Sequence, residues 1–517
     1  MKKGLLLSVF FAGLTSLALE MSASRLLGSV FGTSNLVWAS IIGLILIYLS
    51  AGYFLGGFWA DRSPEWKTFY RILIWAGIAI IIVPLIAKPI LRIAADAFDA
   101  LQLGVMLGSF LSVVILFIVP VTLLGTISPF AIRLAVNTKE DSGKISGKLY
   151  AVSTLGSFFG TFLPDLVLIP AIGTYKTFLI ISLIPLLIGL IGLMRTSGIR
   201  STIVYIWIPF LIPLLNIWGF GGSLKTTTGL IYEKESSYNY IQVLEQDDYR
   251  YLRLNEGQGI HSVYHPNHLN YSGPWQQVLV GPYFNTAPHS PENIDRIAIL
   301  GLAAGTTARQ ATAVYEDIQI DGYEIDPDIV AAGIKLFGMD LPNINIFVQD
   351  GRWGLEKSPH KYQIISVDAY RPPYIPWHMT TQEFFKIVYD HLSDDGVLVV
   401  NVGRAPNDRR LIDSLSSTIL TTFSSVHVVD LPNSFNSILF ATKKETLSNN
   451  LIENYNYLYQ ESDVHPLLLE AINAAITNLA TAPSAAMIFT DDKAPVEWIT
   501  NTMVLNFVLS EDMETLQ

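Results

Sequence analysis

Long apolar stretches dominate the first 220 residues of the chain. Each is close to or longer than the roughly 20 residues with which an α-helix crosses a bilayer. The pattern therefore predicts a transmembrane bundle of about seven helices. The predicted helices cover residues 4–30, 34–59, 69–94, 101–136, 147–172, 174–194 and 202–220.

The first stretch has a second interpretation. Lys2 and Lys3 precede a short apolar core that ends in small residues, which is also the pattern of a secretory signal peptide. The same stretch contains Glu20 and Arg25, and ionisable groups at membrane depth are costly unless they are paired inside the protein. A retained helix with a buried Glu20–Arg25 pair explains these residues better, and a role in transport is the alternative.

Proline and glycine in this half favour a packed bundle over a pore. In a bundle they allow kinks and close helix contacts, because neighbouring helices satisfy the freed backbone groups. The residues concerned are Pro120, Pro129, Pro164 and the glycines of 156–160.

The charged connections predict the orientation of the bundle. Residues 60–67, 137–144 and 195–200 are short connections that hold six of the 15 Lys and Arg of this half, and the positive-inside rule places them in the cytoplasm. Seven crossings from a cytoplasmic N-terminus would leave residues 221–517 outside the cell.

After about residue 221 the pattern changes to short β-rich runs. From residue 296 onward these runs alternate with helical patterns at 306–315, 327–338 and 381–392. This alternation predicts an α/β fold with a parallel, doubly wound sheet, and a small antiparallel sheet ahead of it. The predicted strands are 238–245, 249–257, 296–302, 318–326, 344–351, 362–370, 396–403 and 426–432.

Composition supports a division into two parts. The 517 residues are 50% hydrophobic and only 15% charged; residues 1–220 have a net charge of +7 and residues 221–517 one of −18, which gives the total of −11. With no cysteine, disulfides, thiolate nucleophiles and Cys-ligated zinc are excluded. We predict a bundle over 1–220 and a second domain over 221–517, made of a small β-sheet (about 230–290), a Rossmann-like core (about 291–445) and a helical part (about 446–517).

Four consecutive strand ends carry glycine or acidic residues. Gly301 and Gly305 close the first strand of the parallel sheet and open a helix, where backbone can approach a nucleotide. Glu324 follows 23 residues after Gly301, at the distance of a carboxylate that binds a ribose diol. Asp350 is placed to accept from an adenine amino group, and Asp368 ends the fourth strand. Ligands of such sheets bind at this rim, so the pattern predicts an adenosine-type ligand.

At these residues the chain resembles the spermidine synthase family of polyamine aminopropyltransferases, over about 238–445. The whole chain resembles the membrane-bound branch of that family. The matching stretches are LGLAAGTTAR (300–309) for the glycine-rich loop, GYEID (322–326) for the ribose-binding strand, VQDG (348–351) for the adenine-binding turn, VDAYRPPYIPWHMTTQEFF (367–385) for the catalytic segment, and FTDDKAPVEWI (489–499) for a further motif of the membrane-associated relatives.

The resemblance implies a methyltransferase-like fold that transfers an aminopropyl group from decarboxylated S-adenosylmethionine to a polyamine amine such as putrescine, leaving methylthioadenosine. The donor is a co-substrate, and neither a tightly bound cofactor nor a metal is expected. In this SN2 displacement the protein must hold a neutral amine in line with the carbon and supply a carboxylate for its proton. We predict Asp368 as that base. The predicted donor-binding residues are Gly301, Gly305, Glu324, Asp350, Gly351 and Asn239.

The acceptor side departs from the family pattern. Ala304 stands where members usually carry an aspartate, and Asn239 where a donor-contacting glutamine is common. A Tyr-His-Glu run preceded by Asp-Glu is replaced by Trp275, Gln276 and Gln277, preceded by Tyr271 and Ser272. The sequence therefore does not specify the acceptor. The predicted polyamine-binding residues are Tyr370, Trp275, Gln276 and Tyr271.

Three histidines close together invite a metal-site interpretation. His261, His265 and His268 have neither a carboxylate partner nor a helix-face spacing. Both are usual in histidine metal sites, so we expect a loop with hydrogen-bonded histidines instead.

Taken as a whole, the sequence predicts an aminopropyltransferase-like enzyme anchored in the cell's inner membrane by several crossings. The expected partners are a small polyamine, the lipid bilayer and a second copy of the chain, without nucleic acid. The alternatives are an S-adenosylmethionine-dependent methyltransferase, which the fold also permits, and a membrane transporter or sensor with a polyamine- or nucleoside-binding domain. The donor is made in the cytoplasm, which favours a cytoplasmic domain and conflicts with seven crossings.

Overall fold

A computed structural model describes most of the chain, as two compact units. The first unit comprises Met1–Thr226 and Glu233–Tyr240, and the second Thr227–Tyr232 and Ile241–Gln517. The described residues are 3–31, 35–101, 105–136, 142–218, 228–255, 259–370, 374–405, 407–432 and 434–509.

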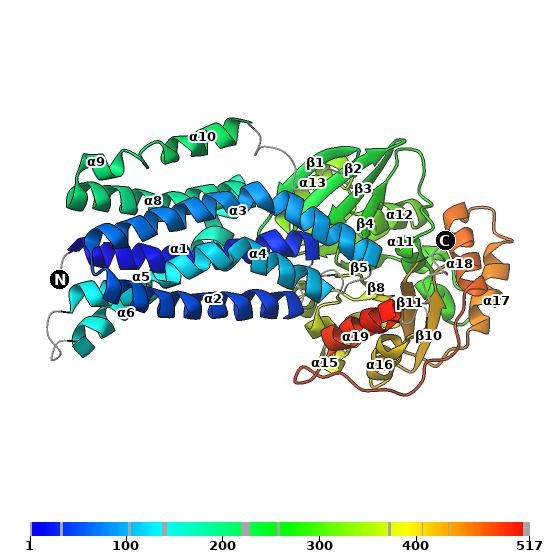
Figure 1. Cartoon of the computed structure of the whole chain (residues 1–517). Helices are drawn as coiled ribbons and strands as arrows, with labels where there is room; N and C mark the ends of the chain where they lie inside the picture. The colour runs from blue at the N-terminus through cyan, green and yellow to red at the C-terminus, as the bar shows by residue number, and fades with distance from the viewer. Residues whose placement is uncertain are drawn as a thin grey trace. The chain divides into compact units, whose positions relative to one another are not determined.

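The first unit is a bundle of long apolar helices (Figure 1). Within the described ranges, six helical segments are long and apolar enough to cross a membrane: Lys3–Gly28, Val37–Arg62, Trp66–Ala87, Leu111–Ala135, Ser142–Ile172 and Thr174–Ser197. The helices are α1 (Lys3–Phe31), α2 (Asn35–Arg62), α3 (Trp66–Leu101), α4 (Val105–Gly125), α5 (Ile127–Ala135), α6 (Ser142–Leu163), η1 (Pro164–Leu168), α7 (Ile169–Ile172), α8 (Thr174–Ser197), α9 (Ile199–Thr202) and α10 (Ile208–Trp218).

The seventh predicted segment, 202–220, differs from the other six. Its described part contains α10, which has 11 residues and is shorter than the roughly 20 that a crossing takes. Residues 219 and 220 lie outside the described part of the chain. The structure thus gives six spanning-length segments in its described part where the pattern predicts seven.

Glycines bring α1 and α6 into backbone contact, as the sequence predicts for a bundle. A Cβ atom on Gly156 would lie 1.9 Å from the Phe10 carbonyl oxygen, and one on Gly160 would lie 2.2 Å from that of Leu14. Larger residues at these positions would force the two helices apart.

The predicted pair of Glu20 and Arg25 is replaced by a different one. The Arg25 Nε lies 3.7 Å from Oδ1 of Asp165, which belongs to the π-helical turn η1. The prediction was wrong because residues five apart point roughly 140° away from each other around a helix. Arg25 therefore meets a carboxylate from another helical segment.

A small antiparallel sheet precedes the larger one. Its order is β1-β2-β3-β4, with β2 antiparallel to β3 and β3 to β4. The strands are β1 (Leu230–Glu235), β2 (Tyr240–Gln246), β3 (Tyr249–Leu254) and β4 (Ile260–Tyr264).

In the described ranges the larger sheet has seven strands, in the order β10-β11-β9-β8-β5-β6-β7. Strands β9, β8, β5, β6 and β7 run parallel to one another. Strand β11 lies between β9 and β10 and runs antiparallel to both. This confirms the predicted Rossmann-like, methyltransferase-type fold, although the antiparallel β11 was not predicted. The strands are β5 (Arg296–Leu300), β6 (Gln319–Glu324), β7 (Ile344–Val348), β8 (Tyr362–Val367), β9 (Leu392–Gly403), β10 (Ser425–Asp430) and β11 (Asn436–Thr442).

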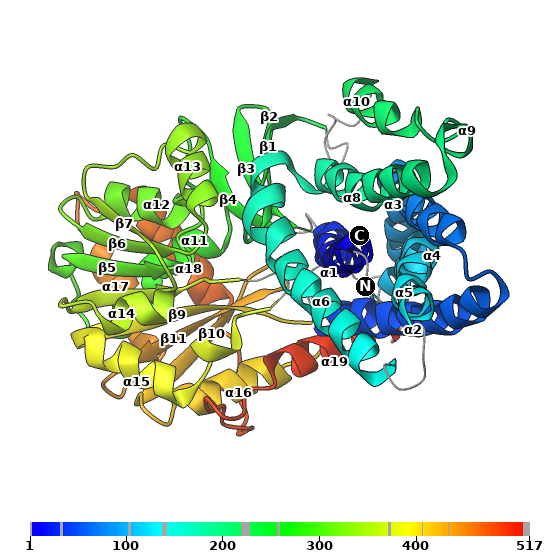
Figure 2. The same cartoon turned by 90° about the vertical axis from the view of Figure 1, so that its left-hand side faces the viewer.

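Helices cover both faces of this sheet, as Figure 2 shows. One face packs against α12 (Thr306–Val314), α13 (Pro327–Leu336), η2 (Val278–Phe284), α17 (Asn449–Leu458) and α18 (Pro466–Thr477). The other packs against α14 (Gly351–Glu356), α15 (Gln382–His391), α16 (Arg410–Ile419) and α19 (Val496–Leu509). Short helices connect these elements: α11 (Pro274–Gln277), η3 (Pro291–Asn293) and η4 (Trp377–Met379).

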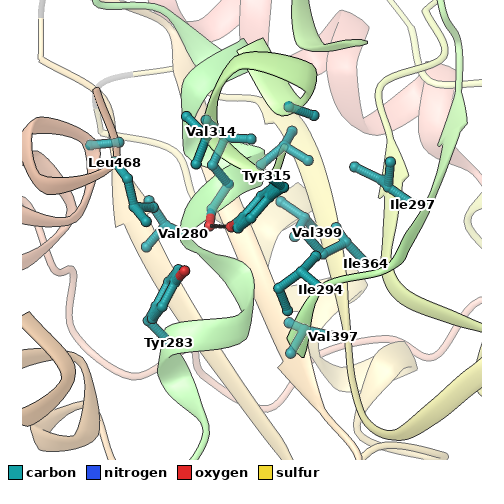
Figure 3. Close-up of a cluster of buried hydrophobic side chains, with 14 of the residues drawn as sticks. Val280, Tyr283, Ile294, Ile297, Val314, Tyr315, Ile364, Val397, Val399 and Leu468 are labelled. Atoms are coloured by element: carbon teal, nitrogen blue, oxygen red, sulfur yellow. Dashed lines mark hydrogen bonds between the residues drawn. The ribbon is translucent and has the colours of Figure 1, made fainter. Parts of the chain in front are cut away.

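A buried apolar core packs against the first face of the larger sheet. Tyr283 and Tyr315 are buried in the same apolar cluster as Ile364 and Val399 of the sheet (Figure 3). The Tyr315 hydroxyl donates to the Leu279 carbonyl oxygen at 2.7 Å, so its polar end is satisfied inside an apolar cluster. The strands whose ends carry the site therefore pack on a buried apolar core.

Candidate functional site

The predicted donor-side residues meet at one edge of the larger sheet. Leu300 of β5 pairs with Tyr323 of β6 and with Val367 of β8, so the next residues of these strands lie at the same rim. The residues that this parallel register aligns are Gly301, Glu324 and Asp368, with Asp350 following the end of β7.

Gly301 brings the glycine-rich loop against the end of β8. Its φ is +92°, and a Cβ atom there would lie 2.5 Å from the carbonyl oxygen of Asp368. Its N–H donates to the Tyr323 carbonyl at 3.0 Å. Gly305, with a φ of +86°, then begins α12 in the left-handed conformation. Glycine tolerates such backbone at little cost, which explains both positions of the motif.

The small sheet holds the same loop from the other side. The Ala304 N–H donates to the Ser262 hydroxyl at 2.9 Å, and the Thr306 hydroxyl bonds to the N–H and the carbonyl of Val263 at 2.8 and 2.9 Å. Ala304 is fully buried and packs with Ile241 and other apolar side chains. A carboxylate at this position would be desolvated, so the departure at Ala304 fits its surroundings.

Glu324 is held by backbone N–H groups of two loops. Its Oε2 accepts from Ala303 at 3.0 Å and its Oε1 from Asp326 at 3.1 Å. The residue is 8% exposed, and burial raises the pKa of its carboxyl to about 7. Each oxygen keeps a lone pair for a ligand hydroxyl, which agrees with a diol-binding role.

Asp350 has two structural partners. It caps α14, where its Oδ1 accepts from the Trp353 N–H at 3.0 Å. Its Oδ2 lies 2.9 Å from Nε2 of His378, and this hydrogen bond lowers the pKa of Asp350. A Cβ on Gly351 would lie 3.1 Å from the Leu300 side chain, so the turn packs closely on β5. The predicted contact with adenine stays a prediction.

Asp368 is a partly buried carboxylate fixed from two directions. Its N–H donates to the Leu300 carbonyl at 2.9 Å, and its Oδ1 accepts from Nδ2 of Asn401 at 2.8 Å. Burial raises the pKa of Asp368 to about 7, against the lowering effect of Asn401. Among the described residues, its Oδ2 accepts no hydrogen bond, so this oxygen retains its acceptor capacity.

Asn401 and Asn436 extend this arrangement and were not predicted. Oδ1 of Asn401 accepts from Nδ2 of Asn436 at 2.7 Å, and its carbonyl accepts from the Tyr370 hydroxyl at 3.1 Å. Burial also raises the pKa of Tyr370. The signal for Asn401 is one polar residue in the apolar strand GVLVVNVG (396–403).

The other predicted acceptor-side residues bond to one another and to neighbouring parts of the chain. The Trp275 indole N–H donates to the His261 carbonyl at 3.3 Å, and the Tyr271 N–H donates to Oε1 of Gln276 at 3.2 Å. The Tyr271 hydroxyl donates to the His268 carbonyl at 2.7 Å. Their contact with a polyamine stays a prediction.

Asn239 belongs to the first unit, in the segment Glu233–Tyr240. Its N–H donates to the Ser236 hydroxyl at 2.8 Å in the turn between β1 and β2. Its predicted contact with the donor stays a prediction.

The histidine loop is built from hydrogen bonds and ring contacts. Nδ1 of His265 accepts from the Asn267 N–H at 3.0 Å, and its ring centre lies 4.5 Å from that of Tyr249. Burial lowers the pKa of His261 to about 4. Across the described ranges, no group of three or more His, Cys, Asp or Glu is arranged to hold a metal ion.

Comparison with known proteins finds relatives that are named polyamine aminopropyltransferases. A probable polyamine aminopropyl transferase of Bifidobacterium longum is 35% identical over 321 residues, which cover 59% of this chain and 68% of the relative. A polyamine aminopropyltransferase of Vibrio vulnificus is 26% identical over 277 residues, or 52% of this chain and 90% of the relative. A solved structure of a probable spermidine synthase from Corynebacterium glutamicum covers 51% of this chain and 100% of its own, at 19% identity and a TM-score of 0.39. No family model matches.

Proposed function

Because the chain belongs to the polyamine aminopropyltransferase family, we propose that it transfers the aminopropyl group of decarboxylated S-adenosylmethionine to an amine of a polyamine such as putrescine. The bond between the aminopropyl carbon and the sulfonium sulfur breaks, and a bond from that carbon to the amine nitrogen forms. The products are methylthioadenosine, a proton and a spermidine-type polyamine.

The observation that carries the proposal is the close approach of the glycine loop to Asp368. A Cβ on Gly301 would lie 2.5 Å from the Asp368 carbonyl oxygen, so a donor bound at this loop would lie beside that residue. Glu324, whose oxygens are already oriented by two backbone N–H groups, is suited to the ribose diol of the donor. The arrangement supports a donor and a base at one site.

Asp368 has the properties of a general base for this step. An acceptor amine is protonated at neutral pH and must lose a proton before its lone pair can attack. A base works best when its pKa is near the working pH, and burial raises the pKa of Asp368 to about 7. Asn401 holds one oxygen at 2.8 Å, which orients the carboxylate without protonating it.

The acceptor side is proposed to be more aromatic than acidic. Tyr370 bonds to the Asn401 carbonyl, which brings it near Asp368, and we assign it to the amine channel. Tyr271, Trp275 and Gln276 are proposed to complete that channel. The first two are aromatic, and aromatic faces attract ammonium groups through cation–π interactions. The membrane anchor and a homodimer are further parts of this proposal.

The proposal is tested with the purified full-length protein in detergent. Decarboxylated S-adenosylmethionine is supplied with putrescine, cadaverine or spermidine, and methylthioadenosine and the amine product are identified by mass. S-adenosylmethionine in a parallel reaction distinguishes methyl transfer, which would yield S-adenosylhomocysteine. Methylthioadenosine formed only in the presence of an amine supports the proposal, and its absence with every amine contradicts it.

A further inference from the structure

The segment Phe489–Lys493 comes from the motif FTDDKAPVEWI and has no part in the chemistry proposed above. Phe489 is fully buried. Its N–H donates to the Thr418 hydroxyl at 2.9 Å, and its carbonyl accepts from the Gln382 N–H at 2.9 Å. These contacts fix the segment between α16 and the start of α15, two residues before Asp491.

Asp491 makes a two-pronged ion pair with Arg352. Oδ1 and Oδ2 of Asp491 each lie 2.7 Å from a different guanidinium nitrogen. The Arg352 guanidinium holds the pKa of Asp491 below its usual value. The Thr381 hydroxyl, at the start of α15, donates to the same Oδ1 at 2.7 Å. Asp491 therefore joins α14 to the start of α15.

Arg352 passes this constraint to the predicted adenine turn. It is the second residue of α14, directly after Asp350 and Gly351. Its Nη1 also donates to the His378 carbonyl at 2.8 Å, and the His378 ring bonds to Oδ2 of Asp350 at 2.9 Å. A continuous set of contacts thus leads from Asp491 to the Asp350 carboxylate.

The C-terminal helix α19 also contacts the segment that follows the predicted base Asp368. The Tyr374 hydroxyl donates to Oδ1 of Asn501 in α19 at 2.5 Å. Tyr374 is buried, and the described segment from Tyr374 to Thr381 is thereby held at both ends. We call Asp491, Arg352 and His378 the clamp.

We propose that Asp491 is a positioning residue for the donor, acting through Arg352 and His378 on Asp350. This inference rests on the proposed function. The Asp491 side chain is 41% exposed, and exposed ion pairs contribute little to folding stability. A bidentate arginine–carboxylate pair, however, fixes geometry. The clamp should therefore affect donor binding more than it affects the fold.

The test compares Asp491→Asn with Asp492→Asn, which removes the same charge from the adjacent exposed residue. Donor KM, kcat, methylthioadenosine affinity by calorimetry and melting temperature are measured on the full-length protein. For Asp491→Asn we expect donor KM and the methylthioadenosine Kd to rise about tenfold, with kcat within about threefold. The melting temperature should fall by no more than about 4 °C. Asp492→Asn should match the wild type.

A second variant tests the clamp independently of Asp491. Arg352→Lys keeps the charge but loses the two-pronged geometry, so it should weaken methylthioadenosine binding in the same direction and by less. If Asp491→Asn does not fold, this variant decides the question. Wild-type affinity for methylthioadenosine in a folded clamp variant would overturn the inference while leaving the proposed function intact. A wild-type protein that does not bind methylthioadenosine would overturn both.

Discussion

At the scale of single residues, Asp368 should have the largest effect on the chemical step. Asp368→Asn preserves the shape of the side chain and removes its basicity. Loss of a general base typically costs about 10² to 10⁴ in rate, so methylthioadenosine production should fall by that factor. Donor affinity should change by less than about tenfold, or 1.4 kcal/mol. Single-turnover product formation and calorimetry with methylthioadenosine measure the two quantities separately.

Two outcomes for this variant would revise the role of Asp368. Full turnover with every accepted amine would show that another group takes the proton. A joint collapse of turnover and donor affinity would place Asp368 in the adenosine pocket.

The raised pKa of Glu324 predicts that donor binding depends on pH. Burial raises the pKa of this carboxyl to about 7, and the ionised form accepts hydrogen bonds at both oxygens, whereas the protonated form loses acceptor capacity. The affinity for methylthioadenosine should therefore rise as the pH rises through about 7. Glu324→Gln should weaken binding by about 1.5–3 kcal/mol and remove this pH dependence. Calorimetry between about pH 6 and 8 tests both, and an unchanged affinity in the variant would refute the ribose assignment.

At the scale of elements, the turn between β5 and α12 depends on Gly301. An alanine there would adopt a φ of +92°, with its Cβ 2.5 Å from a backbone oxygen, and backbone cannot move aside as cheaply as a flexible side chain. We expect Gly301→Ala to lower the free energy of unfolding by roughly 1–3 kcal/mol and to abolish donor binding. Gly259→Ala is the control, because among the described residues its Cβ would meet the His261 ring, at an ordinary contact distance of 3.5 Å. Denaturant unfolding of both variants makes the comparison, and equal stabilities would contradict the argument.

The sequence could predict those parts of the site that follow directly from alternating strands and helices. Gly301, Glu324 and Asp368 stand at the ends of successive buried runs, and the structure aligns them at one rim. Asn401 and Asn436 could not be predicted in the same way. Their contact depends on β11 inserting antiparallel between β9 and β10, which is decided by packing of the whole sheet and leaves no local pattern.

The clamp could not be predicted from the sequence for the same reason. Asp350, Arg352 and His378 come together with Asp491 across more than a hundred residues of sequence. A motif can mark such a segment as unusual, but it does not say which elements the segment joins. Only the packing of α14 and α15 against the C-terminal part supplies that information.

At the scale of the whole molecule, the number of crossings decides where the second domain lies. The apolar stretch 202–220 is long enough for a crossing by composition, but its described helix α10 has only 11 residues, with Pro213 inside it. Residues 203–207 form turns instead of helix. These turns interrupt the apolar stretch at a point that a count of apolar residues does not detect. Six segments of spanning length then remain in the part of the chain that the structure describes.

With six crossings, the orientation predicted from the charged connections agrees with the cytoplasmic origin of the donor. The positive-inside rule places the connections after the second, fourth and sixth spanning segments, which include 60–67, 137–144 and 195–200, in the cytoplasm. Since nothing of spanning length follows Ser197 in the described part of the chain, the second domain should share that side, where its donor is made. We therefore predict that a reporter fused after Gln517 and one inserted near Gly198 both read as cytoplasmic, and that a reporter after Phe31 reads as extracytoplasmic. A cytoplasmic signal near Gly198 combined with an extracytoplasmic one after Gln517 would mean that 202–220 crosses the membrane after all. In that case the enzyme would be separated from its donor, and a binding or sensor domain would become the better interpretation.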